Sequence, residues 1–131
     1  MNTFSEKSKE NLATAHPDLQ RLFNEIIKDF DCTICCGYRG QAEQDEAFRI
    51  KASKVKWPYS KHNLIPSMAV DVTPYPLEWK DEKRMYYFAG YVKEKAKELG
   101  IDIRWGGDWD SDTEVDDQDF NDLPHFELIG G

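Results

Sequence analysis

The amino-acid sequence predicts one compact domain that contains both helices and strands. Apolar residues at helical spacing alternate along the chain with short β-prone runs that end at Gly or Pro. A chain of 131 residues has the size of one domain and can bury a core without disulfide bonds. No internal repeat or low-complexity linker divides the chain, so we expect a single domain over residues 1–131.

Four segments combine apolar residues at helical spacing with residues that favour helix ends. Ser5 can cap the first helix, Pro17 can open the second, and Gly100 can end the last. His16, which precedes that proline, is interpreted as a surface or capping residue. We expect these helices after Ser5 and over residues 17–30, 41–51 and 81–100.

Four short runs are predicted to be strands, over residues 32–37, 68–72, 101–105 and 123–129. In the second run, Asp71 faces the side opposite Val70 and Val72, where a carboxylate needs a cationic partner or a metal. In the last run, His125 and Glu127 share one face. Residues 53–67 are expected to form a long loop, and Gly106-Gly107 a turn.

The net charge of −8 is concentrated at the end of the chain. Residues 1–104 carry a net charge of +1, whereas residues 105–131 carry −9 and contain no Lys or Arg. A nucleic-acid partner requires a basic face that neutralises phosphates. Only a modest group of cations is present, over residues 49–61, and we interpret it as a solvated face. We therefore expect no nucleic-acid partner.

Three cysteines fall within five residues, an odd number that fits a reducing compartment better than a disulfide framework. Strand alternation points Cys32 and Cys35 to opposite faces, so we interpret the cysteines as small core residues. The chain has no run of about 20 apolar residues and no signal-peptide pattern at its start. We expect synthesis in the cytoplasm and no membrane span.

Two histidines lie beside carboxylates in the stretches SKHNLIPSMAVDV, residues 60–72, and NDLPHFEL, residues 121–128. His62, Asp71 and His125 would supply two imidazoles and one carboxylate, which leave a fourth position for water as in catalytic zinc sites. Asp122 is then placed to act as a general base on that water. If the strands that carry Asp71 and His125 are neighbours, the pattern predicts a small zinc hydrolase.

Five further residues could serve this site. Arg39, at a strand-to-helix turn, could hold a substrate carbonyl or carboxylate with its fork of donors. Ser60 and Glu127 could fix the imidazoles, and the loop that carries Trp57 and Tyr59 could form one wall of a substrate groove. Each short fragment also occurs by chance, so a surface histidine or a solvated acid is the alternative interpretation.

The acidic stretch before the last strand has two interpretations. Its alternating carboxylates could bind calcium, but the stretch lacks the central Gly and full ligand order of an EF-hand. Otherwise it is a solvated acidic loop. The candidate calcium ligands are Asp108, Asp110, Asp112, Glu114 and Asp116.

The stretches GYRGQAEQ, SKHNLIPSMAVDV and DLPHFEL resemble the zinc peptidases of the D-alanyl-D-alanine carboxypeptidase and L-alanyl-D-glutamate endopeptidase group. The resemblance is greatest to the small phage endolysins and extends over nearly the whole chain. It implies an α+β fold, with a small antiparallel sheet flanked by helices, of the kind found in Hedgehog and D,D-peptidase domains. It also implies that some relatives use the acidic loop for calcium control.

The resemblance implies zinc bound by His62, Asp71 and His125, Asp122 as the catalytic carboxylate and Arg39 as the substrate-orienting residue. The implied substrate is the peptidoglycan stem peptide, cut at the L-Ala–D-Glu bond by a monomeric lysin that acts on the wall after release. Here Asp122 precedes Leu123-Pro124 instead of the Glu and Trp of many carboxypeptidases. A D-alanyl-D-alanine carboxypeptidase and a non-catalytic, zinc-retaining wall-binding module remain the alternatives.

Overall fold

The computed structural model describes residues 2–109 and 122–129. Helices and strands follow one another along this part of the chain, with one turn of 3-10 helix, η1, before β2. The α-helices are α1 (Glu6–Ala13), α2 (Pro17–Asp29), α3 (Gln41–Arg49) and α4 (Glu82–Leu99). The remaining elements are β1 (Cys32–Cys36), η1 (Lys61–Asn63), β2 (Ala69–Pro74), β3 (Ile103–Gly106) and β4 (Asp122–Leu128).

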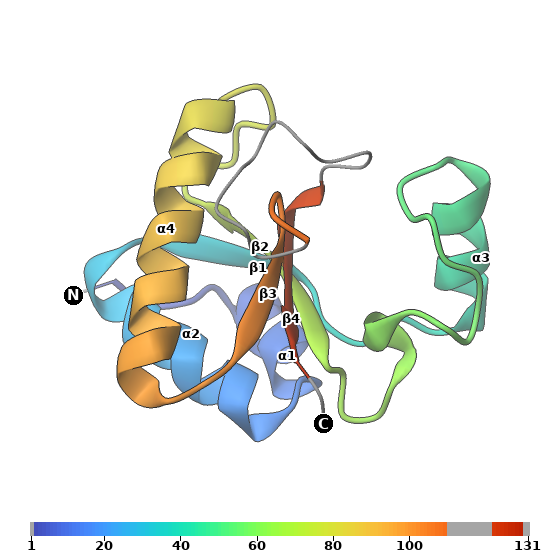
Figure 1. Cartoon of the computed structure of the whole chain (residues 1–131), viewed down its shortest axis with the longest axis horizontal. Helices are drawn as coiled ribbons and strands as arrows, with labels where there is room; N and C mark the ends of the chain where they lie inside the picture. Colours follow the sequence, from blue (N-terminus) through green and yellow to red (C-terminus); the bar gives the residue numbers. More distant parts are fainter. Residues whose placement is uncertain (1, 110–121, 130–131) are drawn as a thin grey trace.

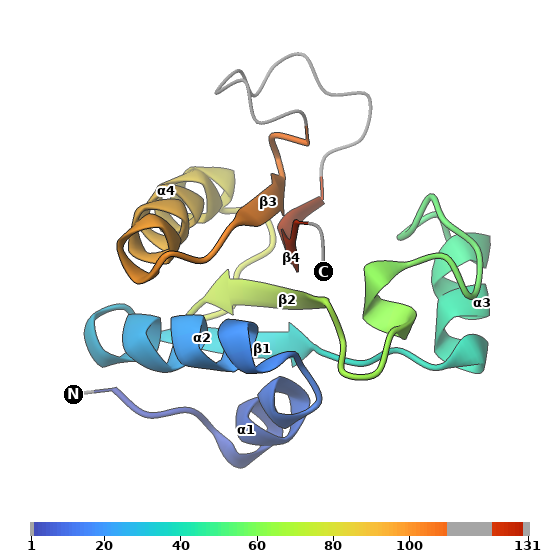
Figure 2. The ribbon, with the colours of Figure 1, turned by 60° about the horizontal axis from the view of Figure 1, so that its bottom comes forward.

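The four strands form one sheet in the order β1-β2-β4-β3, and every neighbouring pair is antiparallel. Helices α2 and α4 lie together beside the sheet, whereas α3 lies apart from the other helices, on the far side of the sheet from α4 (Figures 1 and 2). The fold is therefore α+β with a small antiparallel sheet flanked by helices, as expected.

The predicted helix ends are confirmed. The Ser5 hydroxyl accepts a hydrogen bond from the Ser8 amide, and His16 Nδ1 accepts one from the Asp18 amide. His16 is thus a capping residue of α2. Gly100 caps the C-terminal end of α4 with φ = 72°, in the left-handed region.

The hydrophobic core lies between the sheet and the helices. Phe126 of β4 is fully buried and makes edge-to-face contacts with Phe23 of α2 and Phe88 of α4. Val70 and Val72 of β2 belong to the same core, so strand alternation turns Asp71 to the opposite face. One face of the sheet is therefore scaffold, and the other is available for polar chemistry.

One local expectation is incomplete. The stretch that contains His62 is not only loop, because the Ser60 hydroxyl accepts from the His62 amide and Asn63 Oδ1 accepts from the Ser60 amide, which forms η1. The predicted Gly106-Gly107 turn is present, because the Asp108 amide donates to the Trp105 carbonyl oxygen. Gly106 is also the last residue of β3, opposite Asp122. A Cβ at Gly106 would lie 2.0 Å from the Asp122 carbonyl oxygen, so the close approach requires glycine.

None of the helices in the described ranges is long and apolar enough to span a membrane.

Two glycines of the α4 region should respond oppositely to alanine. Gly90 lies exposed inside α4, and a Cβ there meets no atom within 4 Å, so Gly90→Ala should stabilise by about 0.5–1 kcal/mol. Gly100→Ala should destabilise by about 1 kcal/mol, because alanine disfavours a positive φ. Urea unfolding midpoints measure both, and shifts of the same sign would contradict the assignment of the α4 end.

Candidate metal centre

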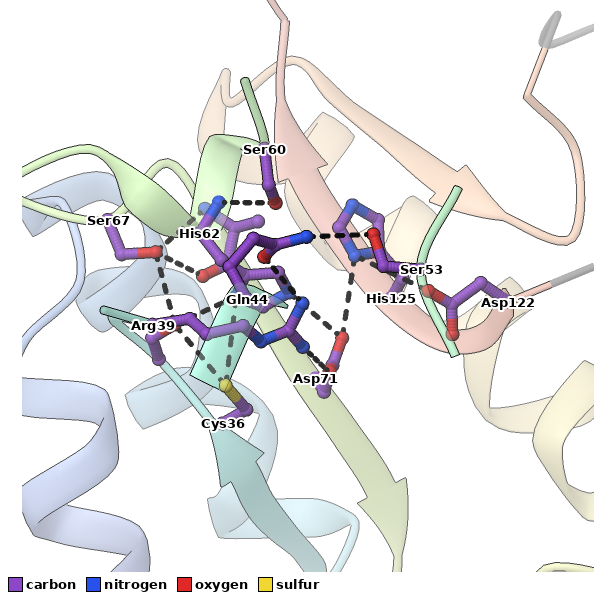
Figure 3. A network of polar contacts seen from close by, with 12 residues as sticks. Cys36, Arg39, Gln44, Ser53, Ser60, His62, Ser67, Asp71, Asp122 and His125 are labelled. Atoms are coloured by element: carbon purple, nitrogen blue, oxygen red, sulfur yellow. Dashed lines mark hydrogen bonds and ion pairs between the residues drawn. The ribbon is translucent and has the colours of Figure 1, made fainter. Parts of the chain in front are cut away.

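Antiparallel pairing places two of the predicted ligands side by side. Asp71 of β2 lies directly opposite His125 of β4, and Asp71 Oδ1 is 3.4 Å from His125 Nδ1. The capped turn η1 brings in His62, whose Nε2 is 3.2 Å from the same carboxylate oxygen (Figure 3). Within the described residues, His62, Asp71 and His125 are the group whose ligand atoms all lie within 4.8 Å of one another.

The second nitrogen of each imidazole has a fixed hydrogen-bond partner. His62 Nδ1 lies 2.8 Å from the Gly37 carbonyl oxygen, to which it donates. His125 Nε2 lies 2.7 Å from Glu127 Oε1 and donates to it. These bonds leave His62 Nε2 and His125 Nδ1 facing Asp71, where a metal ion that displaces their protons would find both lone pairs. The donor set therefore fits a metal ion. Glu127 contacts the imidazole of His125, whereas Ser60 accepts from the backbone amide of His62 and does not bond its ring.

The electrostatics of the site favour positive charge. Burial lowers the pKa of His62, but the charge and hydrogen bond of Asp71 outweigh burial and raise that pKa to about 10. Burial likewise lowers the pKa of His125, while Asp71 and Glu127 raise it above its usual range. Burial would raise the pKa of Glu127, but the hydrogen bond with His125 and the contact with Arg104 lower it to about 2. A divalent cation would supply the charge that these carboxylates stabilise.

Asp122 lies beside the three candidate ligands but outside their cluster. Its Oδ2 is 3.8 Å from His125 Nδ1, and its side chain reaches toward the imidazole from the start of β4 (Figure 3). Burial and the charge of Asp71 raise the pKa of Asp122 to about 6. A carboxylate with a pKa near neutrality is suited to accept and return a proton.

Arg39 is tied to the site through Asp71 and through a buried glutamine that the sequence analysis did not identify. Its Nη2 is 3.3 Å from Asp71 Oδ2, and its Nη1 donates to Gln44 Oε1 at 3.1 Å. Gln44 is 0% exposed and also accepts from Asn63 Nδ2, while its own amide donates to Ser53 Oγ and Val55 O. Gln44 thereby connects α3 to Arg39 and to η1.

Cys36 also lies in the site, which corrects the interpretation of all three cysteines as core residues. Cys32 is buried in the core, but Cys36 Sγ lies 3.9 Å from His62 Nδ1. A β-bulge between Ile34 and Cys36 causes this. Ile34 pairs with Val72 on the core face, and after the bulge Cys36 pairs with Asp71 instead of continuing on that face.

A cavity of about 570 Å³ opens at the two imidazoles and is lined by Arg39 and Asp122. Of the two aromatic residues in the predicted groove wall, Tyr59 lines this cavity and Trp57 does not. Trp109 also lines this cavity, with its ring centroid 5.2 Å from that of His125.

The calcium prediction falls largely outside the described residues. Asp110, Asp112, Glu114 and Asp116 lie in the range that the structure does not describe. Asp108 is described and buried, with its Oδ2 3.9 Å from Lys93 Nζ. A calcium site therefore stays a prediction.

Comparisons with known proteins agree with this geometry. A family model described as phage L-alanyl-D-glutamate peptidase matches residues 1–129. The chain is 30% identical over 120 residues to the L-alanyl-D-glutamate peptidase of Escherichia phage T5. The aligned residues cover 88% of this chain and 87% of that protein. The crystal structure of the Serratia marcescens L-Ala D-Glu endopeptidase ChiX has a TM-score of 0.73 and 31% identity, and covers 95% of this chain and 88% of its own.

A more distant structure shares the fold alone. The vancomycin resistance D,D-pentapeptidase VanY, in complex with Zn(II), has a TM-score of 0.52 and 18% identity. The similarity covers 87% of this chain and 70% of that one.

Proposed function

Because the chain belongs to the phage L-alanyl-D-glutamate peptidase family, we propose that it is a zinc-dependent endopeptidase of bacterial peptidoglycan. It hydrolyses the L-Ala–D-Glu bond of the stem peptide and acts as a phage or prophage endolysin that lyses the cell wall. The T5 enzyme and ChiX carry this activity in their names, and both are about as long as this chain.

The observation that carries the proposal is the pairing of Asp71 with His125 across β2 and β4, with His62 Nε2 facing the same carboxylate. Two imidazoles and one carboxylate are the ligand type of catalytic zinc sites, which keep a position for water. The distant VanY structure, which shares the fold, is itself a zinc complex. His62, Asp71 and His125 would hold the zinc ion.

When bound, zinc activates water and polarises the scissile carbonyl as a Lewis acid. Asp122 accepts the proton of the attacking water and then delivers it to the leaving amine of D-Glu. Arg39, which lines the cavity beside Asp122, donates hydrogen bonds to the carbonyl or to a substrate carboxylate. Glu127 holds the imidazole of His125 in position, and Ser60 fixes the turn that carries His62.

Digestion of purified peptidoglycan tests the reaction. We expect mass spectrometry to find new amino termini at D-Glu and new carboxyl termini at L-Ala. Release of terminal D-Ala would instead identify a D-alanyl-D-alanine carboxypeptidase. Binding of the wall without any new terminus would identify a zinc-retaining binding module.

Loss of the Glu127 carboxylate should weaken the metal site without removing a ligand. Glu127→Ala removes the acceptor that fixes the His125 ring, and the expected fall in zinc affinity is roughly 10–100-fold. Competition with a chromophoric chelator measures the affinity. Glu98→Ala, which removes an exposed acid of α4, is the control and should bind zinc as the wild type does.

Three finer features belong to the same proposal. The protein works as a monomer, and it reaches the wall after release from the cytoplasm where it is made. Calcium bound by the acidic stretch that includes Asp108 raises the activity. A calcium chelator that spares zinc should then lower the activity. Equal activity with and without calcium would show that calcium does not control this protein.

A further inference from the structure

Two cavities meet at the candidate metal centre. The first, described above, is lined by His62 and His125, and a second of about 460 Å³ is lined by Asp71. Arg39 and Asp122 line both. The three candidate ligands are thus divided between the cavities, and a scissile bond held at the centre would have one cavity on each side.

The charges that line the two cavities differ. In the first cavity, which we call the cationic cavity, four basic side chains face two carboxylates. The basic residues are Arg39, Lys54, Lys61 and Arg104, and the acids are Asp122 and Glu127. In the second cavity two basic residues face three acids. These are Arg39 and Lys51 against Asp71, Glu82 and Asp122. An anionic group is therefore favoured in the cationic cavity.

The second cavity has an aromatic wall, and we call it the Trp79 cavity. Trp79 is 54% exposed, and the apolar side chains of Met85, Leu123 and Pro124 complete the lining. An exposed indole ring offers a flat apolar face together with a polar N–H. Such a face suits the C–H surface of a sugar ring better than a carboxylate, because the face of the ring carries negative partial charge.

The stem peptide has the matching asymmetry around the L-Ala–D-Glu bond. On the D-Glu side, one carboxylate stays free next to the scissile amide, because the chain continues through the other. On the L-Ala side, the amino group is joined to the lactyl group of N-acetylmuramic acid, an uncharged part of the sugar. One side of the bond is therefore anionic and the other ends in a saccharide.

We propose that the Trp79 cavity is a saccharide subsite that receives the N-acetylmuramyl group, while the cationic cavity receives the free carboxylate of D-Glu. This inference rests on the proposed function and adds to it the direction in which the substrate lies. Trp79 stacks on the sugar ring, and Lys54 faces the carboxylate.

Two soluble substrates test the saccharide subsite. One is N-acetylmuramyl-L-Ala-D-Glu-L-Lys-D-Ala, and the other replaces the muramyl group by acetyl. We expect the wild type to prefer the muramyl peptide in kcat/KM and Trp79→Ala to lower this preference roughly tenfold. Trp79→Phe should keep most of the preference. Tyr59→Ala, which removes an aromatic of the cationic cavity that is 80% exposed, is the matched control and should keep the ratio.

A second pair of substrates tests the carboxylate. Replacing D-Glu by D-isoglutamine converts the free carboxylate into an amide. Lys54→Gln should lower the preference for the acid up to about fivefold, the range of one partly exposed ion pair. Lys51→Gln makes the same change in the Trp79 cavity and should leave that preference in place.

The outcomes separate the inference from the function on which it rests. A muramyl preference that survives Trp79→Ala overturns the saccharide subsite. If Tyr59→Ala removes the preference instead, the substrate lies in the opposite direction. If the wild type cuts neither peptide between L-Ala and D-Glu, the proposed function itself fails. Thermal unfolding and zinc content of each variant exclude a loss caused by misfolding.

Discussion

Asp122→Asn is expected to lower kcat/KM on the muramyl peptide by a factor between about a hundred and ten thousand, the contribution of a general base. Asparagine keeps the size of the side chain but cannot accept a proton. Zinc should remain bound, because Asp122 lies outside the group formed by His62, Asp71 and His125. Steady-state kinetics and zinc content measured on the same preparation check both statements.

The fold should tolerate this change. Burial and the charge of Asp71 raise the pKa of Asp122, so the ionised carboxylate is disfavoured in the folded state and its removal should not lower the melting temperature. Asp102→Asn, at an exposed position before β3, makes the same substitution away from the site and should keep full activity. Activity retained in Asp122→Asn would remove Asp122 from the mechanism, and loss of zinc would identify it as a ligand.

Asp71→Asn is expected to abolish zinc binding and activity together. Asp71 lies between the two imidazoles and also contacts Arg39, so the neutral amide removes the negative charge that the site places next to the metal. Zinc at a thousand times its Kd should stabilise the wild type by about 4 kcal/mol, because only the folded protein holds the ligands together. The melting temperature of Asp71→Asn should not respond to zinc.

The two variants form a matched pair, since the same Asp-to-Asn change is made at two positions of one site. Melting curves are recorded with added zinc and with zinc removed by a chelator. Zinc should raise the melting temperature of the wild type and of Asp122→Asn, but not that of Asp71→Asn. A zinc-dependent rise in Asp71→Asn would mean that the ion is held elsewhere. Equal loss of zinc by both variants would contradict the assignment of Asp71 as a ligand and Asp122 as a base that does not bind the metal.

Much of the fold follows from local sequence. Ser5, His16 and Gly100 mark helix ends because capping depends on residues close in the chain. The alternation of Val70, Asp71 and Val72 also fixes which side chain leaves the core, because successive residues of a strand point to opposite faces. The candidate ligands could therefore be identified from their types and spacing, together with the family resemblance.

Other parts of the site depend on contacts between distant segments. The sequence does not specify the bulge that turns Cys36 toward His62, because a bulge is defined by the strand with which it pairs. Gln44 appears in the sequence as one polar residue of a helix, and only packing joins it to Arg39 and Asn63.

The sequence by itself determined the helices, the strands and the residue types that can bind a metal, because these follow from local periodicity and side-chain chemistry. The tertiary structure decided the β1-β2-β4-β3 order, which pairs Asp71 with His125. It also decided that Tyr59 and Trp79 line two different cavities that share Arg39 and Asp122. The physical reason is that strand pairing and cavity shape arise from contacts between segments far apart in the chain, which no local pattern encodes.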